Sequence, residues 1–524
     1  MLNPDNYNLA LDCVDKHADL LQNKHKVALV YLKEDPASGR LREPPLKLSY
    51  SSLKGLTNAM ANGFASLGLE RGSRVLLRLA NSTEFLISFL GAVKAGLIPV
   101  PTSPLLTWPE LEYLLRDSGA AAFVTSQELL PPEFSAAKLP AMKEVILASE
   151  AAGSFQRWQD LLKNSSTEFR VEPTQAEDPA YWLYTSGTEG KPKAVIHAHR
   201  SIPAHDARAR LWQDLKAGDV VFNTSALNWS YALTAGWLDV WRHGLTSVIY
   251  QGRPRPELIA GTLARHGVTV FMSVPGIYRR LLPLAKADSV PFSGLRVALS
   301  AGEKLGEQTR EEFRRATGLE IREGLGMTEH SVYLVQALGQ GSPPGSCGRP
   351  LPEQKIAILK EDLSPCPPGE SGILASHRSC PGLMLGYHGE AAGQTFQDDW
   401  FLSGDLAYRD EADHYFFLGR RDEVLNSGGY RVSPLEIEAA LNEHPAVEES
   451  AAVSAEPEPG KSYVQAFVVL KAGPAATQET AGQILRSLES RLAQYKIPRQ
   501  IVFLRELPKT SNGKLQRHRL KNLA

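Results

Sequence analysis

The sequence predicts an α/β protein whose large N-terminal region is followed by a small α+β domain. In the first 340 residues, segments with a helical pattern alternate with short apolar runs, which is typical of helices layered on largely parallel sheets. After about residue 340, prolines and glycines become frequent and the expected strands shorten, as in small barrels or antiparallel sheets. The chain has 524 residues, several times the ~100–200 residues that one domain needs.

The clearest single helix prediction covers Phe85–Ala95. Asn81 and Glu84 have the spacing of a capping box before it, and Gly96 ends the pattern. The short apolar run Ile98–Pro101 then predicts a strand. The stripe of the helix that we expect to be buried consists of Phe85, Leu86, Phe89, Leu90 and Val93.

The same alternation continues along the chain. We expect helix Pro109–Arg116 before strand Ala121–Thr125, and helix Pro256–His266 before strand Val268–Met272. The pattern of expected elements changes again after Gly419-Arg420, from short strands to helices and a longer strand. We therefore place a domain boundary there, with residues 1–420 in the large domain and 421–524 in the small one. The elements expected in the small domain are helix Ser433–Leu441, strand Tyr463–Leu470 and helix Gln478–Ala493.

Composition and charge exclude several classes of protein. Hydrophobic residues make up 43% and charged residues 22% of the chain, which excludes a chiefly disordered, fibrous or disulfide-stapled molecule. Lys and Arg number 57 against 58 Asp and Glu, a net charge of -1. Electrostatics therefore give no reason to expect nucleic acid or an anionic membrane as the main partner.

The cysteines and the most apolar segment indicate a cytoplasmic protein. The four cysteines show no CxxC pair and no metal-ligand spacing, which fits a reducing compartment. The most membrane-like stretch, Phe85–Leu106, is interrupted by Lys94 and three prolines, so we expect no membrane insertion. The N-terminus lacks the apolar core of a signal peptide. The cysteines are Cys13, Cys347, Cys366 and Cys380.

The strongest chemical signal is the segment YTSGTEGKPKAV, Tyr184–Val195. Its hydroxyl groups, glycines and lysines can wrap phosphate oxygens with N–H, O–H and ammonium donors. It lacks the spacing of a Walker A loop, and by composition alone it could also be a flexible surface turn. The residues concerned are Thr185, Ser186, Gly187, Thr188, Gly190, Lys191 and Lys193.

Further motifs follow this loop in a recognisable order. Together with the loop, the chain resembles the adenylate-forming superfamily of acyl-CoA synthetases, adenylation domains and luciferases, from about residue 45 to its C-terminus. The segment Asn426–Glu438 is most similar to medium-chain acyl-CoA synthetases and, a little less, to benzoate-CoA ligases. The motifs are SAGE at Ser300–Glu303, GLGMTE at Gly324–Glu329, SGD at Ser403–Asp405, GRRDE at Gly419–Glu423 and LPKTSNGKLQR at Leu507–Arg517.

The resemblance implies a fold and a reaction. The fold would be two α/β subdomains and a small β-barrel-like subdomain, followed by a small mobile C-terminal lid domain. The reaction would be AMP-forming ligation of a carboxylic acid to CoA, through an acyl-AMP, with ATP, Mg²⁺ and CoA. An aromatic, benzoate-like acid and a medium-chain acid both stay open. The oligomeric state is also open, although homodimers are common among such relatives.

Catalytic and nucleotide-binding roles carry over from the matching motifs. Lys514 would bridge the carboxylate and the α-phosphate, Thr328 would contact the α-phosphate, and Glu329 would bind the metal ion. Asp422 would be the hinge of the small domain. The resemblance assigns the nucleotide to Thr185, Ser186, Gly187, Thr188, Gly190, Lys193, Gly302, Glu303, Glu323, Gly324, Leu325, Asp405, Arg420 and Arg431.

The resemblance also implies an acyl pocket and a CoA tunnel. Gly326 stands where acetyl-specific relatives have a tryptophan, so a longer or aromatic acid should fit, and Gly276 should enlarge the site further. Ordinary core packing is the competing interpretation for the aromatic and aliphatic walls. The expected walls are Trp229, Tyr231, Val332 and Tyr333, and the pantetheine arm of CoA would pass Ser427, Gly428 and Gly429.

Two positions depart from the phosphate-loop pattern. Glu189 stands where Thr or Ser is usual, and an acidic side chain near a triphosphate is electrostatically unfavourable unless it points outward or meets Mg²⁺. Ala194 replaces a usual glycine and requires only a negative φ. His197 and His199 match a family feature, for which we expect a structural role at a helix start.

Two other functions compete with a CoA ligase. One is an acyl-AMP ligase that loads a carrier protein, disfavoured by the CoA-ligase character of residues 426–438. The other is a non-catalytic nucleotide- or acyl-binding relative, suggested by Glu189 and Ala194. A binder would not need Lys514. CoA-dependent turnover discriminates among the three.

Overall fold

The structure is a computed structural model that describes residues 5–149, 155–186, 191–421, 425–427, 430–458, 461–489, 491–492, 494–509, 515–521 and 523. Its contacts divide the chain into two compact units. Unit 1 comprises Met1–Gly341, Gly348–Lys355 and Arg378–Asp399, and unit 2 comprises Ser342–Cys347, Ile356–His377 and Trp400–Ala524. Each unit is built around its own sheets, so the expected α/β architecture is confirmed.

Unit 1 contains a five-stranded sheet in which every pair is parallel, in the order β4-β3-β5-β6-β7. The predicted strand Ile98–Pro101 is β4, and the predicted helix and strand that follow are α4 (Trp108–Asp117) and β5 (Ala122–Thr125). The other elements of this region are β3 (Arg74–Arg78), β6 (Glu144–Leu147), β7 (Gln156–Arg157), α2 (Tyr50–Ser66) and α5 (Trp158–Lys163).

The predicted helix after residue 80 is α3 (Thr83–Lys94), and all five residues of its expected stripe are buried. The capping box, however, is wrong. Ser82 is the N-cap, because its hydroxyl accepts a hydrogen bond from the backbone N–H of Phe85 at 3.2 Å. Asn81 instead serves a long-range contact: its side chain donates to the carbonyl of Ser225 at 3.1 Å and accepts from the N–H of Leu227 at 2.8 Å.

The last residue of α3 is a buried cation. The ammonium of Lys94 donates to the Asp15 carboxylate at 2.6 Å and to the Asn58 side-chain oxygen at 2.7 Å, and its side chain is fully buried. This pair ties the N-terminal elements η1 (Leu11–Asp15) and α1 (Lys16–Asp19) to α2 and α3. A buried charge needs such partners because its desolvation is costly.

A nine-stranded sheet forms the centre of unit 1, in the order β16-β15-β14-β13-β12-β10-β11-β1-β2. The pairs from β14 through β13, β12, β10 and β11 to β1 are parallel, and the pairs at both edges are antiparallel. The strands are β1 (Val27–Lys33), β2 (Leu46–Ser49), β10 (Val220–Asn223), β11 (Thr246–Gln251), β12 (Val270–Ser273), β13 (Val297–Ala301), β14 (Ile321–Met327), β15 (Ser331–Val335) and β16 (Arg349–Pro350).

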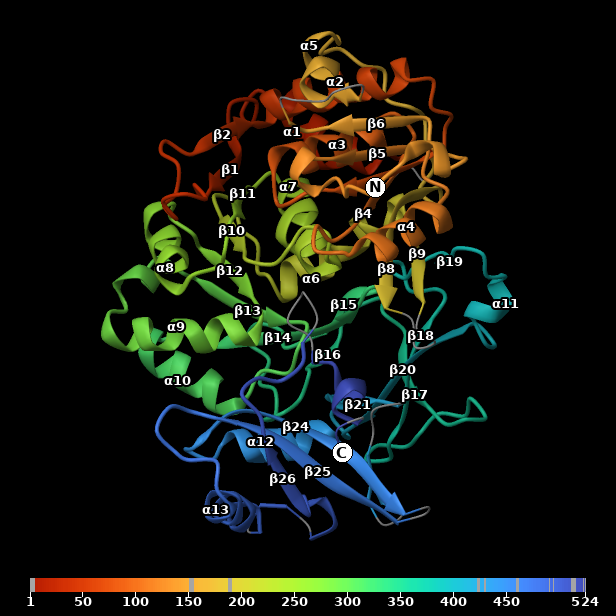
Figure 1. Cartoon of the computed structure of the whole chain (residues 1–524). Coiled ribbons are helices and arrows are strands. Elements are labelled where there is room, and N and C mark those ends of the chain that lie inside the picture. The colour runs from red at the N-terminus through yellow and green to blue at the C-terminus, as the bar shows by residue number, and fades with distance from the viewer. Residues whose placement is uncertain are drawn as a thin grey trace. The chain divides into compact units, whose positions relative to one another are not determined.

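Helices cover this sheet on two sides. The predicted helix after residue 255 is α8 (Pro256–Arg265), and it lies together with α9 (Pro275–Ala287) and α10 (Glu307–Thr317) against one face (Figure 1). The opposite face packs against a core to which η6 (Tyr231–Leu238), a π-helix, and α7 (Asp239–Arg242) contribute apolar side chains. This second core contains Tyr231 and Val332, predicted for the acyl pocket, and Trp229 packs against it.

A small third sheet of unit 1, β19-β9-β8, carries the predicted phosphate loop. Strands β8 (Pro179–Ser186) and β9 (Pro192–Ala198) are antiparallel, and β19 (Gly386–Tyr387) pairs with β9. Thr185 faces Lys193 across the hairpin. Residues 187–190, which join the two strands, lie outside the described residues.

Unit 2 begins with an antiparallel sheet of four strands, β17-β18-β20-β21, as expected for the region after residue 340. The predicted C-terminal elements are α12 (Pro434–Asn442), β25 (Lys461–Leu470) and α13 (Gln478–Leu488), the last ending earlier than expected. The remaining elements are β17 (Ile356–Leu359), β18 (Gly372–His377), β20 (Trp400–Arg409), β21 (Tyr415–Arg420), β22 (Leu425–Ser427), β23 (Tyr430–Val432), β24 (Val447–Glu458), β26 (Gln500–Phe503) and α14 (Arg517–Lys521).

One buried ion pair joins the two last sequence motifs of unit 2. The Arg517 guanidinium donates to both carboxylate oxygens of Glu438, at 2.8 and 2.6 Å, and the N–H of Ala452 donates to the same carboxylate at 2.8 Å. The pair links α14, α12 and β24. Among the described residues, no helix is long and apolar enough to cross a bilayer.

Candidate functional site

The predicted catalytic residues Thr328 and Glu329 lie in a tight turn between β14 and β15. Met327 pairs with Ser331 across the turn, and the N–H of His330 donates to the Met327 carbonyl at 3.2 Å. Ser331 has a φ of +57°, a left-handed conformation that is rare for a residue with a side chain. The conformation of the turn therefore needs support from its surroundings.

Residues from several other elements hold this turn. Nε2–H of His197, in β9, donates to the Thr328 carbonyl at 2.9 Å, and the Tyr387 hydroxyl donates to the Glu329 carboxylate at 2.8 Å. The Glu329 carbonyl accepts from the N–H of Met384 at 2.9 Å. These contacts fix both the backbone and the carboxylate that the resemblance assigns to catalysis.

The next residue of the turn, His330, is also held on two sides. Its Nε2 hydrogen-bonds to the Gln354 side-chain oxygen at 2.7 Å, and its ring stacks on Tyr333 with 4.6 Å between ring centroids. Burial lowers the pKa of His330 to about 3, so the ring is neutral at neutral pH. A neutral ring adds no charge next to Glu329.

The ammonium group of Lys193 lies near the ring of Tyr387, whose hydroxyl donates to Glu329. The Lys193 ammonium lies 5.4 Å from the centroid of the Tyr387 ring and forms an ion pair with Glu390 at 2.9 Å. Tyr387 therefore contacts both Lys193, predicted to bind phosphate, and Glu329, predicted to bind metal. A cation and a carboxylate one tyrosine apart can together accommodate a polyphosphate and a divalent ion.

The rest of the predicted phosphate loop is described only in part. Thr185 is half-buried at the end of β8, while the side chain of Ser186 lies outside the described part. Gly187, Thr188, Glu189 and Gly190 are also outside the described residues. Ala194 is buried in β9 and is not among the residues with positive φ, as its position requires.

Five residues predicted to bind the nucleotide lie in β14 and in the loop after β13, namely Glu323, Gly324 and Leu325 in the strand and Gly302 and Glu303 in the loop. Glu323 is buried, and its carboxylate accepts from the N–H of Leu305 at 2.6 Å and from the Arg310 guanidinium at 2.5 Å. It thereby anchors the loop that carries Gly302 and Glu303 to the strand that carries Gly324 and Leu325. Its side chain is structural, and its backbone N–H and carbonyl are both paired with Gln336, at 2.9 and 3.0 Å.

In unit 2, Asp405 and Arg420, both predicted to bind the nucleotide, are neighbours. Asp405 in β20 pairs with Arg420 in β21, and the guanidinium donates to the carboxylate at 3.2 Å and to the Ser403 carbonyl at 3.1 Å. The Ser403 hydroxyl accepts from the Asp405 N–H at 3.1 Å. The antiparallel pairing thus brings two motifs together that are fifteen residues apart.

Two predicted acyl-pocket and adenine residues touch directly in unit 1. Gly302 has a φ of +93°, and a Cβ added there would lie 2.6 Å from the Trp229 ring. Trp229 packs edge-to-face against Tyr231, with 6.1 Å between ring centroids. Trp229, an expected wall of the acyl pocket, therefore lies directly against the SAGE loop, and Gly302 must be glycine for this approach.

Gly326 is excluded from carrying a side chain by the backbone itself. It lies at a bulge in the β14–β15 pairing, and an added Cβ would be 2.2 Å from the Ser331 carbonyl oxygen. A Cβ on Gly276, by contrast, would meet only the Arg279 guanidinium, at 3.8 Å. Gly276 thus borders open space, while its role in enlarging the acyl pocket stays a prediction.

The remaining expected walls are core residues. Tyr231, Val332 and Tyr333 are almost fully buried, and the Tyr231 hydroxyl makes a long hydrogen bond of 3.5 Å to the Leu299 carbonyl. Core packing and a role as pocket wall are both compatible with this placement.

Several predicted residues of the C-terminal region lie outside the described residues, namely Lys514, Asp422, Gly428 and Gly429. Ser427 and Arg431 belong to the hairpin of β22 and β23, but their side chains are not described. The flanks of the Lys514 segment are closed by pairing of Lys509 with Leu515 and by a hydrogen bond from the Gln516 N–H to the Pro508 carbonyl at 2.8 Å.

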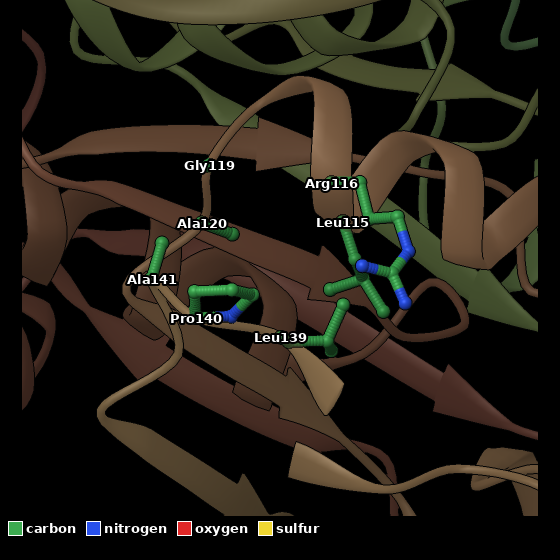
Figure 2. Close-up of a pocket in the computed structure, with 7 residues that line it drawn as sticks. All are labelled: Leu115, Arg116, Gly119, Ala120, Leu139, Pro140 and Ala141. Carbon is green, nitrogen blue, oxygen red and sulfur yellow. The ribbon is translucent and has the colours of Figure 1, made fainter. Parts of the chain in front are cut away.

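A pocket elsewhere in unit 1 contains none of the predicted site residues. It has a volume of about 200 Å³ and lies between the end of α4 and the segment before β6 (Figure 2). Its one charged lining residue, Arg116, forms an exposed ion pair with Glu112 of the same helix at 2.8 Å. The lining residues are Leu115, Arg116, Gly119, Ala120, Leu139, Pro140 and Ala141.

Sequence reasoning missed the residues that support the site. Tyr387 and Arg310 contact the predicted site residues Glu329 and Glu323, and Gln354 contacts His330 next to Glu329, but none of the three belongs to a recognised motif. Their signal was weak, because each reaches the site from a segment distant in sequence. His199 does begin a short helix, η4 (His199–Ser201), as expected, whereas His197 lies in a strand.

Comparison with known proteins gives matches over nearly the whole chain. The model of the AMP-binding enzymes matches residues 17–388, and that of the AMP-binding enzyme C-terminal domain matches residues 436–514. Benzoate–CoA ligase of Thauera aromatica is 34% identical over 463 residues, 87% of each chain. The mitochondrial acyl-coenzyme A synthetase ACSM5 of Homo sapiens is 31% identical over 99% of this chain and 91% of its own length.

A solved structure shows the same likeness in three dimensions. The anthranilate CoA ligase AuaEII in complex with anthranoyl-AMP superimposes with a TM-score of 0.89 at 30% identity, covering 99% of this chain and 98% of that one.

The buried ring of His199 makes the stability of the protein depend on pH. Its Nδ1 accepts the N–H of Leu9 at 3.2 Å, and burial lowers its pKa to about 4. The unfolded state, with a pKa near 6.5, therefore binds this proton first, and stability is lost as pH falls from about 6.5 through 4.

We expect His199→Asn, which keeps an acceptor oxygen at the position of Nδ1, to reduce the pH dependence of the free energy of unfolding by as much as about 1.4 kcal/mol per pH unit. Urea unfolding between pH 7.5 and 4.5 measures it. His25→Asn, at an exposed position, is the control. An unchanged slope for His199→Asn would contradict the assignment.

Proposed function

This chain belongs to the family of AMP-binding enzymes, and from that premise we propose that it activates an aromatic, benzoate-like carboxylic acid for transfer to CoA. It is an AMP-forming acid–thiol ligase. The observation that carries the proposed activation step is the turn of Thr328 and Glu329. The Glu329 carboxylate accepts a hydrogen bond from Tyr387, and the ring of the same tyrosine contacts Lys193. A medium-chain acid is the alternative substrate.

The reaction has two balanced steps. The carboxylate oxygen of the acid attacks the α-phosphorus of ATP, the bond to the β-phosphate breaks, and pyrophosphate leaves with the electron pair. The sulfur of CoA then attacks the acyl carbonyl carbon, the bond to AMP breaks, and the thiol proton passes to solvent. The first step needs neutralisation of a crowded polyphosphate and in-line positioning, which the protein supplies.

The residues around the turn fit a divalent ion that arrives with the nucleotide. Among the described residues, no three His, Cys, Asp or Glu side chains gather closely enough to hold an ion. Glu329 would supply one carboxylate and the phosphates the remaining oxygens, as Mg²⁺ prefers. The bound ion would balance charge on the triphosphate, while Tyr387 orients the carboxylate.

For the nucleotide, we propose the residues that the motifs indicate. Thr185 and Lys193 would contact phosphate together with the loop Gly187–Gly190 and Thr328. Asp405 would accept the ribose hydroxyls, with Arg420 beside it. The adenine ring would lie against Gly302, Glu303 and the backbone of Glu323–Leu325. The close packing of Trp229 on Gly302 supports an adenine site that adjoins the acyl pocket.

The preference for an aromatic acid is supported by the candidate walls. Trp229 and Tyr231 form an edge-to-face pair, and Gly326 stands where acetyl-specific relatives have a tryptophan. Flat rings pack well against such aromatic surfaces. Two similar proteins are ligases of aromatic acids, since the relative from Thauera aromatica is a benzoate–CoA ligase and the solved structure is an anthranilate CoA ligase.

The small C-terminal domain would supply Lys514 and the CoA tunnel. We place the boundary at residues 420–421, with Asp422 as the hinge, Ser427–Gly429 along the pantetheine arm and Arg431 near phosphate. The two family models stop and start on either side of this boundary, at residues 388 and 436. We also propose a cytoplasmic location, supported by four cysteines that form no disulfide, and a homodimer.

The experiment that tests the proposal follows pyrophosphate and AMP release with ATP, Mg²⁺ and CoA across a panel of acids. The panel runs from acetate through octanoate and includes benzoate, 2-aminobenzoate, a hydroxybenzoate and phenylacetate. We expect CoA-dependent turnover that is fastest with a benzoate-type acid. Fastest turnover with octanoate would select the medium-chain alternative.

Other outcomes of the panel point elsewhere. Pyrophosphate exchange without CoA-dependent turnover would indicate a carrier-protein acceptor. No exchange with any acid in folded protein would support a non-catalytic binder, and Glu189→Thr would then show whether the phosphate loop is the cause.

Lys514→Ala should separate the two half-reactions. We expect acyl-AMP formation to fall by about a hundredfold or more, because a charge that neutralises the transition state is lost. Thioester formation from supplied benzoyl-AMP should stay within about twofold. Lys509→Ala, which removes a nearby exposed lysine, is the matched control. An equal fall in both half-reactions would contradict the role.

Tyr387→Phe should weaken binding of the metal–nucleotide complex. Without the hydroxyl, Glu329 loses the donor that orients its carboxylate, so we expect the Mg²⁺ concentration for half-maximal rate and the Kd of Mn–ATP, measured by calorimetry, to rise about five- to tenfold. Tyr250→Phe is the control, since Tyr250 also donates to a glutamate, Glu34, at 2.6 Å. Equal effects of both variants would exclude a specific role.

A further inference from the structure

A cluster of charged residues is buried in the core of unit 1, apart from every recognised motif. Arg208 lies in α6 (Asp206–Leu211), Asp239 begins α7, and His205 ends the short helix η5 (Pro203–His205). The exposed fractions of the Arg208 and Asp239 side chains are 0% and 1%.

The three residues form a closed network. The Arg208 guanidinium forms an ion pair with Asp239, to which its Nε–H also donates at 3.1 Å, and Nδ1–H of His205 donates to the same carboxylate at 3.0 Å. Burial alone would raise the pKa of Asp239, but Arg208 and His205 hold it at about 2. The carboxylate is therefore ionised at neutral pH.

Such a buried pair needs a reason other than stability. Removing two charges from water costs more than their attraction usually returns, and apolar side chains would fill the same space at least as well. A buried guanidinium does, however, offer donors with a fixed geometry. The remaining donors of Arg208 indicate what this geometry serves.

These donors reach the turn that carries the predicted catalytic residues. Nη1 of Arg208 donates to the Ser331 hydroxyl, and Nη2 donates to the Thr234 hydroxyl at 3.2 Å. The hydroxyls of Thr234 and Ser331 are themselves 2.9 Å apart. Ser331 is the residue whose φ is +57°. The network thus hydrogen-bonds to Ser331, the residue of the turn with a left-handed backbone.

We propose that Arg208 is a positioning residue for acyl-AMP formation: with Asp239 and Thr234 it holds Ser331 in its left-handed conformation and so fixes Thr328 and Glu329. Ser331 is two residues from Glu329, and its carbonyl lies against Gly326, so its φ sets the course of the whole turn. The proposal rests on the proposed function.

The same network reaches the candidate acyl pocket. Thr234 lies one helical turn after Tyr231 in η6, and Ser331 directly precedes Val332 in β15. Thr234 also donates to the Ser230 carbonyl at 2.8 Å. Arg208 therefore fixes the pocket helix and the catalytic turn relative to each other within unit 1.

Ser331→Gly and Ser331→Ala test the proposal without disturbing the ion pair. Both remove the hydroxyl, but only alanine opposes a left-handed backbone. We expect the rate constant for acyl-AMP formation, measured by pyrophosphate exchange with the accepted acid, to stay within about twofold for Ser331→Gly and to fall about tenfold for Ser331→Ala. Equal rates for the two variants would overturn the proposal.

Arg208→Met adds a rescue experiment. Alone, we expect it to lower the rate of acyl-AMP formation more than about tenfold while the KM for CoA is unchanged, and Arg208→Met/Ser331→Gly should recover at least about fivefold, since glycine needs no external support. A merely structural role of Arg208 predicts no rescue, and absence of rescue would overturn the proposal. Should Arg208→Met not fold, the two Ser331 variants decide alone.

Lys94→Met is the matched control, because it also deletes the cation of a buried ion pair in unit 1. It should lower the free energy of unfolding without changing the rate per folded molecule. Crystal structures of wild type and variants give the φ of residue 331 directly. This readout does not depend on any acid being accepted, so a failure of the proposed function stays distinguishable. A left-handed residue 331 in Arg208→Met would overturn the proposal.

Discussion

The conformation of the turn between β14 and β15 depends on buried hydrogen bonds that no local sequence supplies. Polar groups in a protein interior must find partners, and here the partners come from β9, β19, α6 and the segment before β17. The nine-stranded sheet sets the position of the turn, and these side chains set its shape. The site is therefore a property of unit 1 as a whole.

Charge balance around the turn follows from the same constraint. Burial keeps His197 and His330 neutral, so neither ring adds a positive charge beside Glu329. A positive charge available to a polyphosphate in this region is that of Lys193. Lys193 in turn is paired with Glu390, which neutralises it without burying it fully. A nucleotide phosphate can thus exchange with a carboxylate that is already solvated in part.

Local patterns were sufficient where periodicity and motifs act over short distances. The helix α3 and the strand β4 could be predicted because their apolar spacing is regular, and the whole buried stripe of α3 was found. The capping box failed because Asn81 has a better partner in the distant segment Ser225–Leu227. The long-range hydrogen bonds of Asn81 replaced the predicted capping box with Glu84, and the four residues Asn81–Glu84 alone do not reveal such distant partners.

The sequence by itself determined the family, the order of the elements and the residue types at the site, because motifs such as GLGMTE are contiguous. Only the tertiary structure decided which side chains support them. The bond from Tyr387 to Glu329 spans 58 residues, and that from Arg208 to Ser331 spans 123. Such pairs leave no spacing signal, since their proximity arises only when strands and helices pack into one core.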